Sequence, residues 1–161
     1  MIIEDNFLDN QSFSNLKSLI LDTEFPWRLR KQMTDDDNNY YFSYSFFNNN
    51  TINSPHYEGH ILPILNKLNC NAVVEVRANL MLSDLFSSES GFHTDCSFKC
   101  NTAILYLNTC DGGTELILDN QGKKIVESKE NRLIMFDSMI KHRSKKSNNS
   151  KERYVLNFNY F

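Results

Sequence analysis

The second half of the chain contains short strand-forming stretches separated by turn signals, and this pattern restricts the fold more than any other feature. The turn signals are Asp-Gly-Gly, Asn-Gln-Gly and Glu-Asn segments. Many short strands with regular turns favour a barrel or a two-sheet jelly roll. The predicted strands are Val73 to Leu82, Thr102 to Leu107, Thr114 to Leu118, Lys124 to Glu127, Leu133 to Phe136 and Arg153 to Tyr160.

Two segments in the first half carry apolar side chains at helical spacing. In residues 13–20 these side chains share one face, and either Asp9 or Ser12 can cap the helix. In residues 57–68 the same spacing is interrupted by Pro63. A proline inside a helix removes a hydrogen bond, so the second helix either kinks or begins later.

The aromatic residues 40–47 lie between two runs of polar residues. They can form a strand of a hairpin, or they can belong to a loop over residues 34–54 that covers a binding site, and both interpretations stay open. A chain of 161 residues has the length of one domain. We expect residues 1–71 to form a helical and loop support, and residues 72–161 to form the jelly-roll core.

The composition excludes several classes of protein. A hydrophobic content of 40% and a charged content of 23% are typical of globular proteins. The net charge of −3 provides no basic field for nucleic acid. No stretch reaches the length of a membrane helix, and the N-terminus lacks the basic region of a signal peptide. We therefore expect a cytoplasmic location with reduced cysteines, and no feature indicates an obligate protein partner.

A candidate metal site begins with His93 and Asp95, which are separated by one residue. On an extended strand, residues i and i+2 point to the same side, so both can face one metal while Thr94 points away. His142 would supply a third ligand from a distant strand. Two imidazoles and one carboxylate can hold Fe(II) on one face and leave positions open for substrate and oxygen. Alone, a His-x-Asp pair can equally be a solvated strand end.

A second polar group accompanies these residues. Arg153 opens the last predicted strand, and its forked guanidinium can bind a carboxylate with two hydrogen bonds. Arg77 and Asn79 lie on the polar face of the strand over residues 73–82, opposite an apolar face. Polar side chains inside a small barrel are costly unless they have partners. Either a metal, an anion and a substrate supply those partners, or these faces point to water.

Four segments together resemble the 2-oxoglutarate- and Fe(II)-dependent dioxygenases. The nearest resemblance is to the prolyl 4-hydroxylase-like branch, which includes short bacterial and phage members. This resemblance implies a mainly β fold, the double-stranded β-helix, which is a jelly roll with flanking N-terminal helices. The segments are Gly91-Phe-His-Thr-Asp95, Ile104-Leu-Tyr-Leu-Asn108, Gly112-Gly-Thr-Glu-Leu116 and Arg153-Tyr-Val-Leu-Asn-Phe-Asn-Tyr-Phe161.

The resemblance also implies a role for each site residue. His93, Asp95 and His142 would be both catalytic residues and iron ligands. Arg153 would pair with the distal carboxylate of 2-oxoglutarate, and Tyr106 would be its hydrogen-bonding companion. The alternative for Tyr106 is a packed aromatic ring whose hydroxyl reaches the surface. The implied reaction consumes O2 and 2-oxoglutarate and hydroxylates an unactivated C–H bond.

The substrate is less well defined by the sequence. The resemblance makes a peptidyl proline the first candidate, in a peptide or protein partner. Arg77, Asn79, Tyr40 and Tyr44 are the candidate substrate-binding residues. Several relatives carry a tyrosine in the strand before His-x-Asp, where this chain has Met81. Because a thioether cannot donate a hydrogen bond, we expect this part of the pocket to be less polar.

Two other functions remain open. The first is oxidation of a small molecule or a nucleobase in the same fold, although the acidic net charge argues against nucleic acid. The second is a jelly roll that binds a metal or a sugar without catalysis, which would not require Arg153 together with Tyr106. We expect Cys96 and Cys100, which lie close to the candidate site, to be ordinary thiols.

Overall fold

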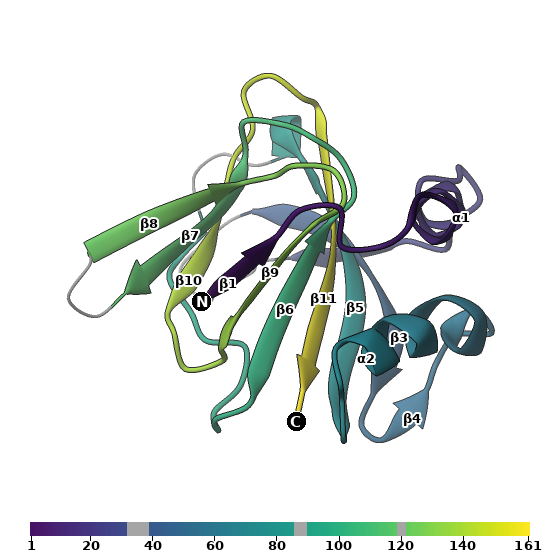
Figure 1. Cartoon of the computed structure of the whole chain (residues 1–161). Helices are drawn as coiled ribbons and strands as arrows, with labels where there is room; N and C mark the ends of the chain where they lie inside the picture. Colours follow the sequence, from purple (N-terminus) through teal and green to yellow (C-terminus); the bar gives the residue numbers. More distant parts are fainter. Residues whose placement is uncertain (32–38, 86–89, 119–121) are drawn as a thin grey trace.

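The computed structural model describes residues 1–31, 39–85, 90–118 and 122–161, and within them the chain forms two β-sheets flanked by helices (Figure 1). The large sheet has the strand order β1-β9-β6-β11-β5-β3-β2, with β4 paired to β3. Its strands are β1 (Ile2–Glu4), β2 (Arg28–Lys31), β3 (Tyr40–Asn48), β4 (Thr51–Ile52), β5 (Val73–Leu82), β6 (Asn101–Tyr106), β9 (Arg132–Asp137) and β11 (Glu152–Tyr160). The small sheet has the order β10-β7-β8, with β7 (Gly113–Leu118), β8 (Gly122–Glu127) and β10 (His142–Lys145).

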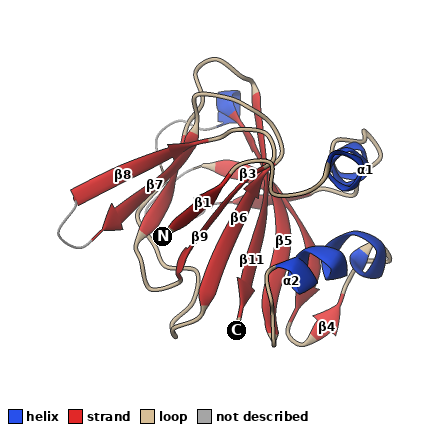
Figure 2. Cartoon of the chain, in the orientation of Figure 1, coloured by secondary structure: helices blue, strands red, loops and turns tan. Residues whose placement is uncertain are grey.

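The two sheets and the helices form layers (Figure 2). Helices α1 (Asn10–Ile20) and α2 (Leu62–Lys67) lie against one face of the large sheet, and the small sheet lies on the other side. All strand pairs in both sheets are antiparallel. This is the arrangement of a double-stranded β-helix, which confirms the predicted fold class.

Alternation along the central strand β11 explains why the large sheet is covered on both faces. Leu156 and Phe158 pack into the apolar core beneath the helices. Arg153, Val155 and Asn157 point the other way, toward the small sheet, and line a pocket. Successive side chains of a strand point to opposite faces, so one strand serves both layers. The apolar face of β11 thus packs beneath the N-terminal helices.

Helix α1 begins where its sequence predicts. The side chain of Asp9 accepts a hydrogen bond of 2.9 Å from the main-chain N–H of Ser12. This cap satisfies one of the N–H groups that the first turn leaves without a partner. Phe13, Leu16 and Ile20 are buried against the large sheet.

The second helical segment has two parts. Tyr57–Ile61 form a π-helical turn, and the regular helix α2 begins only at Leu62. Pro63 therefore lies in the first turn of α2, directly after the π-helical turn. The helix begins later instead of kinking at the proline.

The first 71 residues contribute more strand than their sequence suggests. Residues 40–48 form β3 inside the large sheet, between β2 and β5, so they are not part of a free covering loop. Residues 34–38 of that expected loop lie outside the described residues. The unpredicted strands β1 and β2 carry only exposed side chains. Edge strands of this kind have no apolar alternation, which is the signal that sequence reasoning depends on.

The strands after residue 72 agree with the predicted segments to within a few residues. The exception is β10, whose four residues are mostly polar and were not recognised as a strand. Neither α-helix of the described chain has the length and apolarity that crossing a bilayer requires.

Candidate metal centre and pocket

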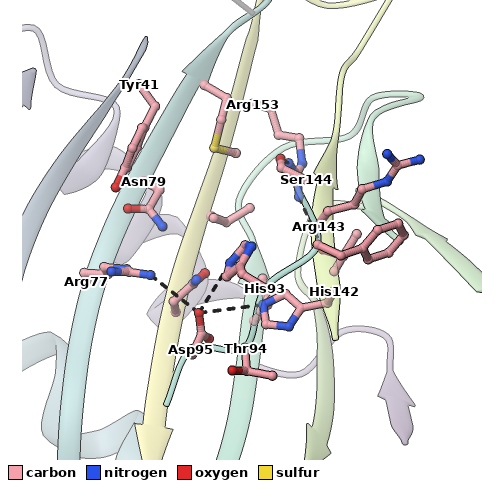
Figure 3. Close-up of a pocket in the computed structure, with 16 residues that line it drawn as sticks. Tyr41, Arg77, Asn79, His93, Thr94, Asp95, His142, Arg143, Ser144 and Arg153 are labelled. Atoms are coloured by element: carbon pink, nitrogen blue, oxygen red, sulfur yellow. Dashed lines mark hydrogen bonds and ion pairs between the residues drawn. The ribbon is translucent and has the colours of Figure 1, made fainter. Parts of the chain in front are cut away.

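A pocket of about 500 Å³ opens between the two sheets (Figure 3). Strands β3, β5 and β11 of the large sheet form one wall, and β7 and β10 of the small sheet form another. Residues 92–95 also line the pocket, and so do all three side chains predicted to bind a metal. The fold thus places the polar faces of several strands around one cavity.

His93, Asp95 and His142 converge on one point. One possible ligand atom from each lies within 4.8 Å of the others. The Nε2 atoms of His93 and His142 are 3.8 Å and 3.7 Å from the same carboxylate oxygen, Oδ1 of Asp95. These separations are longer than hydrogen bonds, and they leave room for an ion between the three groups.

The Asp95 carboxylate needs a cation. Its side chain is only 1% exposed, and neither of its oxygens has a hydrogen-bond partner among the described residues. A buried carboxylate without hydrogen bonds is strongly unfavourable even with the Arg77 guanidinium 3.6 Å from its Oδ1, whereas a divalent metal would satisfy both oxygens. The donor set of two imidazoles and one carboxylate suits Fe(II). The residues present therefore fit this metal.

Main-chain contacts set which nitrogen of each histidine faces the carboxylate. Nδ1 of His93 lies 3.2 Å from the carbonyl oxygen of Gly91, and Nδ1 of His142 lies 3.1 Å from that of Ile140. A carbonyl can only accept, so Nδ1 must carry the proton and donate it. The unprotonated Nε2 of each ring is then left for a metal. Metal-binding histidines are usually supported in this way, by a hydrogen bond from the other ring nitrogen.

The charges around the site keep its groups in ligand form. Burial by itself would raise the pKa of Asp95, but the nearby His142, Arg77 and His93 hold this pKa well below its usual range. Burial and the neighbouring His142 lower the pKa of His93, which favours the neutral ring. An ionised carboxylate and a neutral imidazole are the protonation states that bind metals.

The local structure of the His-x-Asp segment differs from the expectation. His93 is not in a regular strand and forms an isolated β-bridge with His142. Asp95 lies in a bend beyond it. Thr94 does not point away but also lines the pocket. Side chains alternate regularly only along an extended strand. A single bridge at His93 does not hold the segment in that conformation.

Arg153 lies deep in the same pocket, held by two hydroxyl groups. Its Nη1 donates to Oγ of Ser144, and its Nη2 lies 3.4 Å from Oγ1 of Thr114. Thr114 and Ser144 are direct partners across β7 and β10, so their hydroxyls meet the guanidinium from adjacent strands. Nε of Arg153 is buried without a partner among the described residues. The side chain therefore keeps a free donor for an anion.

Tyr106 contacts both Thr114 and Arg153. It is fully buried, and its hydroxyl donates to Oγ1 of Thr114 at 2.8 Å. The guanidinium carbon of Arg153 lies 5.6 Å from the centre of its ring. The hydroxyl does not reach the surface, so the alternative stated for Tyr106 is wrong. Tyr106 does not line the pocket itself, and its contact with Arg153 is through the ring and through Thr114.

The sequence reasoning did not identify Thr114 and Ser144. Thr114 lies in the Gly-Gly-Thr-Glu-Leu segment, so the resemblance contained a signal for it. Ser144 lies in a polar stretch whose strand was not predicted, and only the register with β7 reveals its position. A hydroxyl that faces a distant arginine leaves no local pattern in the sequence.

The candidate substrate residues fall into two groups. Arg77 and Asn79 line the pocket, as expected. Tyr40 is 40% exposed and does not line the pocket, and Tyr44 packs with its ring centre 4.7 Å from that of Phe25. The tyrosine that does line the pocket is Tyr41, on the opposite face of β3. Because aromatic residues occupy both faces of β3, alternation could not distinguish them.

Two further features border the site. Phe92 lines the pocket, and the guanidinium carbon of Arg143 lies 4.5 Å from the centre of its ring. Arg143 also forms an ion pair with Glu115. The sulfur atoms of Cys96 and Cys100 are 3.7 Å apart, and both cysteines are free thiols.

Comparisons with known proteins agree with this geometry. The sequence profile of the 2OG-Fe(II) oxygenase superfamily, whose members use 2-oxoglutarate, matches residues 83–161. No curated protein sequence matches the chain. The matched region contains His93, Asp95, His142 and Arg153.

Solved structures resemble nearly the whole chain. A 2OG-Fe(II) oxygenase family oxidoreductase from Burkholderia pseudomallei is 15% identical with a TM-score of 0.76, and the match covers 99% of this chain and 84% of that one. A prolyl-4-hydroxylase from Pseudomonas putida is 15% identical with a TM-score of 0.63, covering 99% and 91%. A Trichoplax adhaerens prolyl hydroxylase, solved with a peptide fragment of hypoxia inducible factor, is 16% identical with a TM-score of 0.70, covering 99% and 82%.

At such low identity the structural likeness establishes only the fold. The link to a protein family comes from the sequence profile. The profile covers the part of the chain that holds the buried carboxylate, the two histidines and the arginine pocket. Residues 83–161 therefore match the 2OG-Fe(II) oxygenase superfamily, whose members are oxidoreductases that use Fe(II), 2-oxoglutarate and O2.

Proposed function

We propose that the chain is a hydroxylase that binds Fe(II) through His93, Asp95 and His142 and binds 2-oxoglutarate through Arg153. One observation carries the proposal: the candidate iron ligands and a buried arginine with a free donor line the same pocket. A metal-binding jelly roll without catalysis would need the metal ligands but not the buried arginine. The two groups together suit a dicarboxylate that bridges a metal and a guanidinium.

Each residue has a distinct task in this proposal. Arg153 would hold the distal carboxylate of 2-oxoglutarate and so fix the other end toward the metal. Ser144 and Thr114 would keep the guanidinium in position, and Tyr106 would orient Thr114. Bound iron would supply the oxidation of a C–H bond by O2, coupled to decarboxylation of 2-oxoglutarate. The protein itself supplies ligand geometry, orientation and a pocket enclosed between two sheets.

We propose a peptide as the substrate class, with a peptidyl proline as the first candidate to test. Support comes from two structural neighbours, the Pseudomonas putida prolyl-4-hydroxylase and the Trichoplax adhaerens enzyme solved with a peptide fragment. A small molecule is the alternative, because the fold also occurs in a 2-oxoglutarate-dependent epimerase of nogalamycin biosynthesis, which is 10% identical with a TM-score of 0.70.

The test of iron and 2-oxoglutarate binding is an anaerobic titration followed by visible absorption. Fe(II) with 2-oxoglutarate should give a weak charge-transfer band in the wild-type protein. Asp95→Ala should abolish the band. Arg153→Met should retain iron binding but require much more 2-oxoglutarate, by about 10- to 100-fold for a lost charge-assisted pair. Arg28→Met, an exposed arginine on β2, is the matched control and should behave as wild type.

The same experiment separates the alternatives. A protein that binds metal but gives no band with 2-oxoglutarate would be a binding module and not an oxygenase. Unchanged 2-oxoglutarate affinity in Arg153→Met would remove Arg153 from its proposed role. Mass spectrometry of peptide and metabolite pools incubated with enzyme, iron and 2-oxoglutarate should then reveal the substrate as a gain of one oxygen atom.

A further inference from the structure

Three buried polar atoms in the pocket wall have no hydrogen-bond partner in the described part of the chain and are not used by the proposed iron and 2-oxoglutarate sites. They are Nε of Arg77, Oδ1 of Asn79 and Oδ1 of Asn157, which are buried without a hydrogen bond among the described residues. Asn79 is 6% exposed and Asn157 is 8% exposed, and all three residues line the pocket. Leaving a buried polar group unpaired costs about 1–3 kcal/mol. Such groups in a pocket wall indicate a polar ligand.

These residues form one continuous patch. Strands β5 and β11 are neighbours, and Asn157 is the direct register partner of Arg77. Asn79 follows Arg77 by two positions and therefore faces the same side. Figure 3 shows Arg77 and Asn79 projecting from β5 toward the cavity, with the Arg77 guanidinium beside Asp95. The patch thus adjoins the candidate metal site.

Arg77 differs from Arg153 in what it can offer. Its Nη1 lies 3.4 Å from Glu75 and its Nη2 lies 3.6 Å from Asp95, so both ends already face a carboxylate. A further anion here would meet two negative charges. The donor of Arg77 that is buried without a partner among the described residues is Nε. Arg153, whose guanidinium faces two neutral hydroxyls, is the better partner for a dianion.

The buried atoms of the patch without a partner among the described residues are one donor and two acceptors. A primary carboxamide has the complementary set, with an oxygen that accepts and an NH2 group that donates twice. We infer that the prime substrate carries a primary carboxamide, as in an asparagine or glutamine side chain, which this patch recognises. The carboxamide oxygen accepts from Nε of Arg77, and its NH2 group donates to Asn79 and Asn157. This inference rests on the proposed hydroxylase function, and it places an asparagine or glutamine side chain ahead of a peptidyl proline as the group that the pocket recognises.

Binding of matched peptides to protein loaded with Mn(II) and saturating 2-oxoglutarate tests the inference without turnover. The probes are acetyl-Gly-Xaa-Gly N-methylamides with Asn, Gln, Asp, Leu or Pro at Xaa, together with free asparagine and glutamine. Isothermal titration should give the Asn or Gln probe at least tenfold tighter binding than the Leu, Pro and Asp probes. Comparing blocked peptides with free amino acids distinguishes a peptidyl source of the carboxamide from a small molecule.

Two variants tie the preference to the patch. Asn79→Leu leaves the Arg77–Asp95 contact in place and should abolish the preference for carboxamide over leucine. Arg77→Met should do the same while leaving the dissociation constant of 2-oxoglutarate unchanged. Arg30→Met, on β2 outside the pocket, is the control and should keep the wild-type preference.

The other outcomes overturn the inference. A preference for the Asp probe would mean that the patch reads a carboxylate, and equal binding of all probes, or of none, would mean that it reads no such group. Weaker 2-oxoglutarate binding in Arg77→Met with probe binding unchanged would assign Arg77 to the co-substrate. Failure of the proposed function would appear separately, as a missing charge-transfer band in the anaerobic Fe(II) titration.

Discussion

His93 and His142 are hydrogen-bonded to each other through their main chains in both directions. N–H of His93 donates to the carbonyl of His142 at 3.0 Å, and N–H of His142 donates back at 2.9 Å. Their ring centres lie 4.7 Å apart on the same side. The bridge thus attaches the segment that carries Asp95 to the edge of the small sheet. Its backbone contacts do not depend on either side chain.

Removing one histidine side chain should therefore affect the metal more than the fold. His93→Ala or His142→Ala should weaken Fe(II) binding at least ~100-fold. This loss exceeds the effect of removing a residue that only hydrogen-bonds to a metal ligand. Calorimetric titration under anaerobic conditions measures this, and circular dichroism should show an unchanged fold. His60→Ala, at a histidine remote from the pocket, is the control. Wild-type iron affinity in either site variant would contradict the assignment.

Thr114 should control 2-oxoglutarate affinity, because its hydroxyl lies between Tyr106 and Arg153 at 2.8 Å and 3.4 Å. Thr114→Val keeps the shape but removes the shared acceptor, which costs about 1–1.5 kcal/mol. We expect the KM for 2-oxoglutarate to rise about tenfold with little change in kcat. Thr102→Val removes a buried hydrogen bond to Asn159 outside the pocket and should leave this KM unchanged. An equal effect in both variants would indicate general destabilisation.

Gly113 allows β7 and β8 to approach closely. A Cβ atom at this position would lie 2.3 Å from the carbonyl oxygen of Val126, so Gly113→Ala must separate the strands or shift the backbone. Overpacking of this kind costs about 1–3 kcal/mol. Urea denaturation should show the loss. Gly59→Ala, where nothing lies within 4 Å of the added Cβ, should cost much less. Equal stability of Gly113→Ala and wild type would contradict the close approach.

Asp111 should make the loop before β11 sensitive to acid. The main-chain N–H of Asn148, the hydroxyl of Ser147 and the N–H of Asn149 donate to its carboxylate and lower its pKa to about 2. Because this folded pKa lies below the unfolded value of about 3.9, the carboxylate stabilises the fold above that value. The stabilisation is lost as the pH falls through the folded pKa.

Asp111→Asn should therefore be less stable than wild type at pH 6, and the difference should shrink as the pH falls through about 2. Thermal denaturation of both proteins across this range measures the effect, and hydrogen exchange should locate it at residues 147–150. A stability difference that stays constant with pH would show that the charge of Asp111 is not responsible.

Local sequence patterns were sufficient for the parts of this protein that depend on neighbours in the chain. The capped helix α1 follows from residues a few positions apart, and the two faces of β5 and β11 follow from alternation. The identities of the candidate metal ligands and of Arg153 could also be read from the sequence. Two histidines and one carboxylate are typical of an Fe(II) site. These features need no knowledge of which strands are paired.

Strand pairing decided the rest. The hydroxyl contacts of Arg153 come from Thr114 and Ser144, which are adjacent only because β7 and β10 pair in one register. Tyr41 and not Tyr44 reaches the pocket because β3 presents that face to the small sheet, a choice that a strand with aromatic residues on both faces leaves open. The sequence by itself determined which groups are available for chemistry. The tertiary structure alone decided which of them meet, because long-range register is set by the packing of whole sheets.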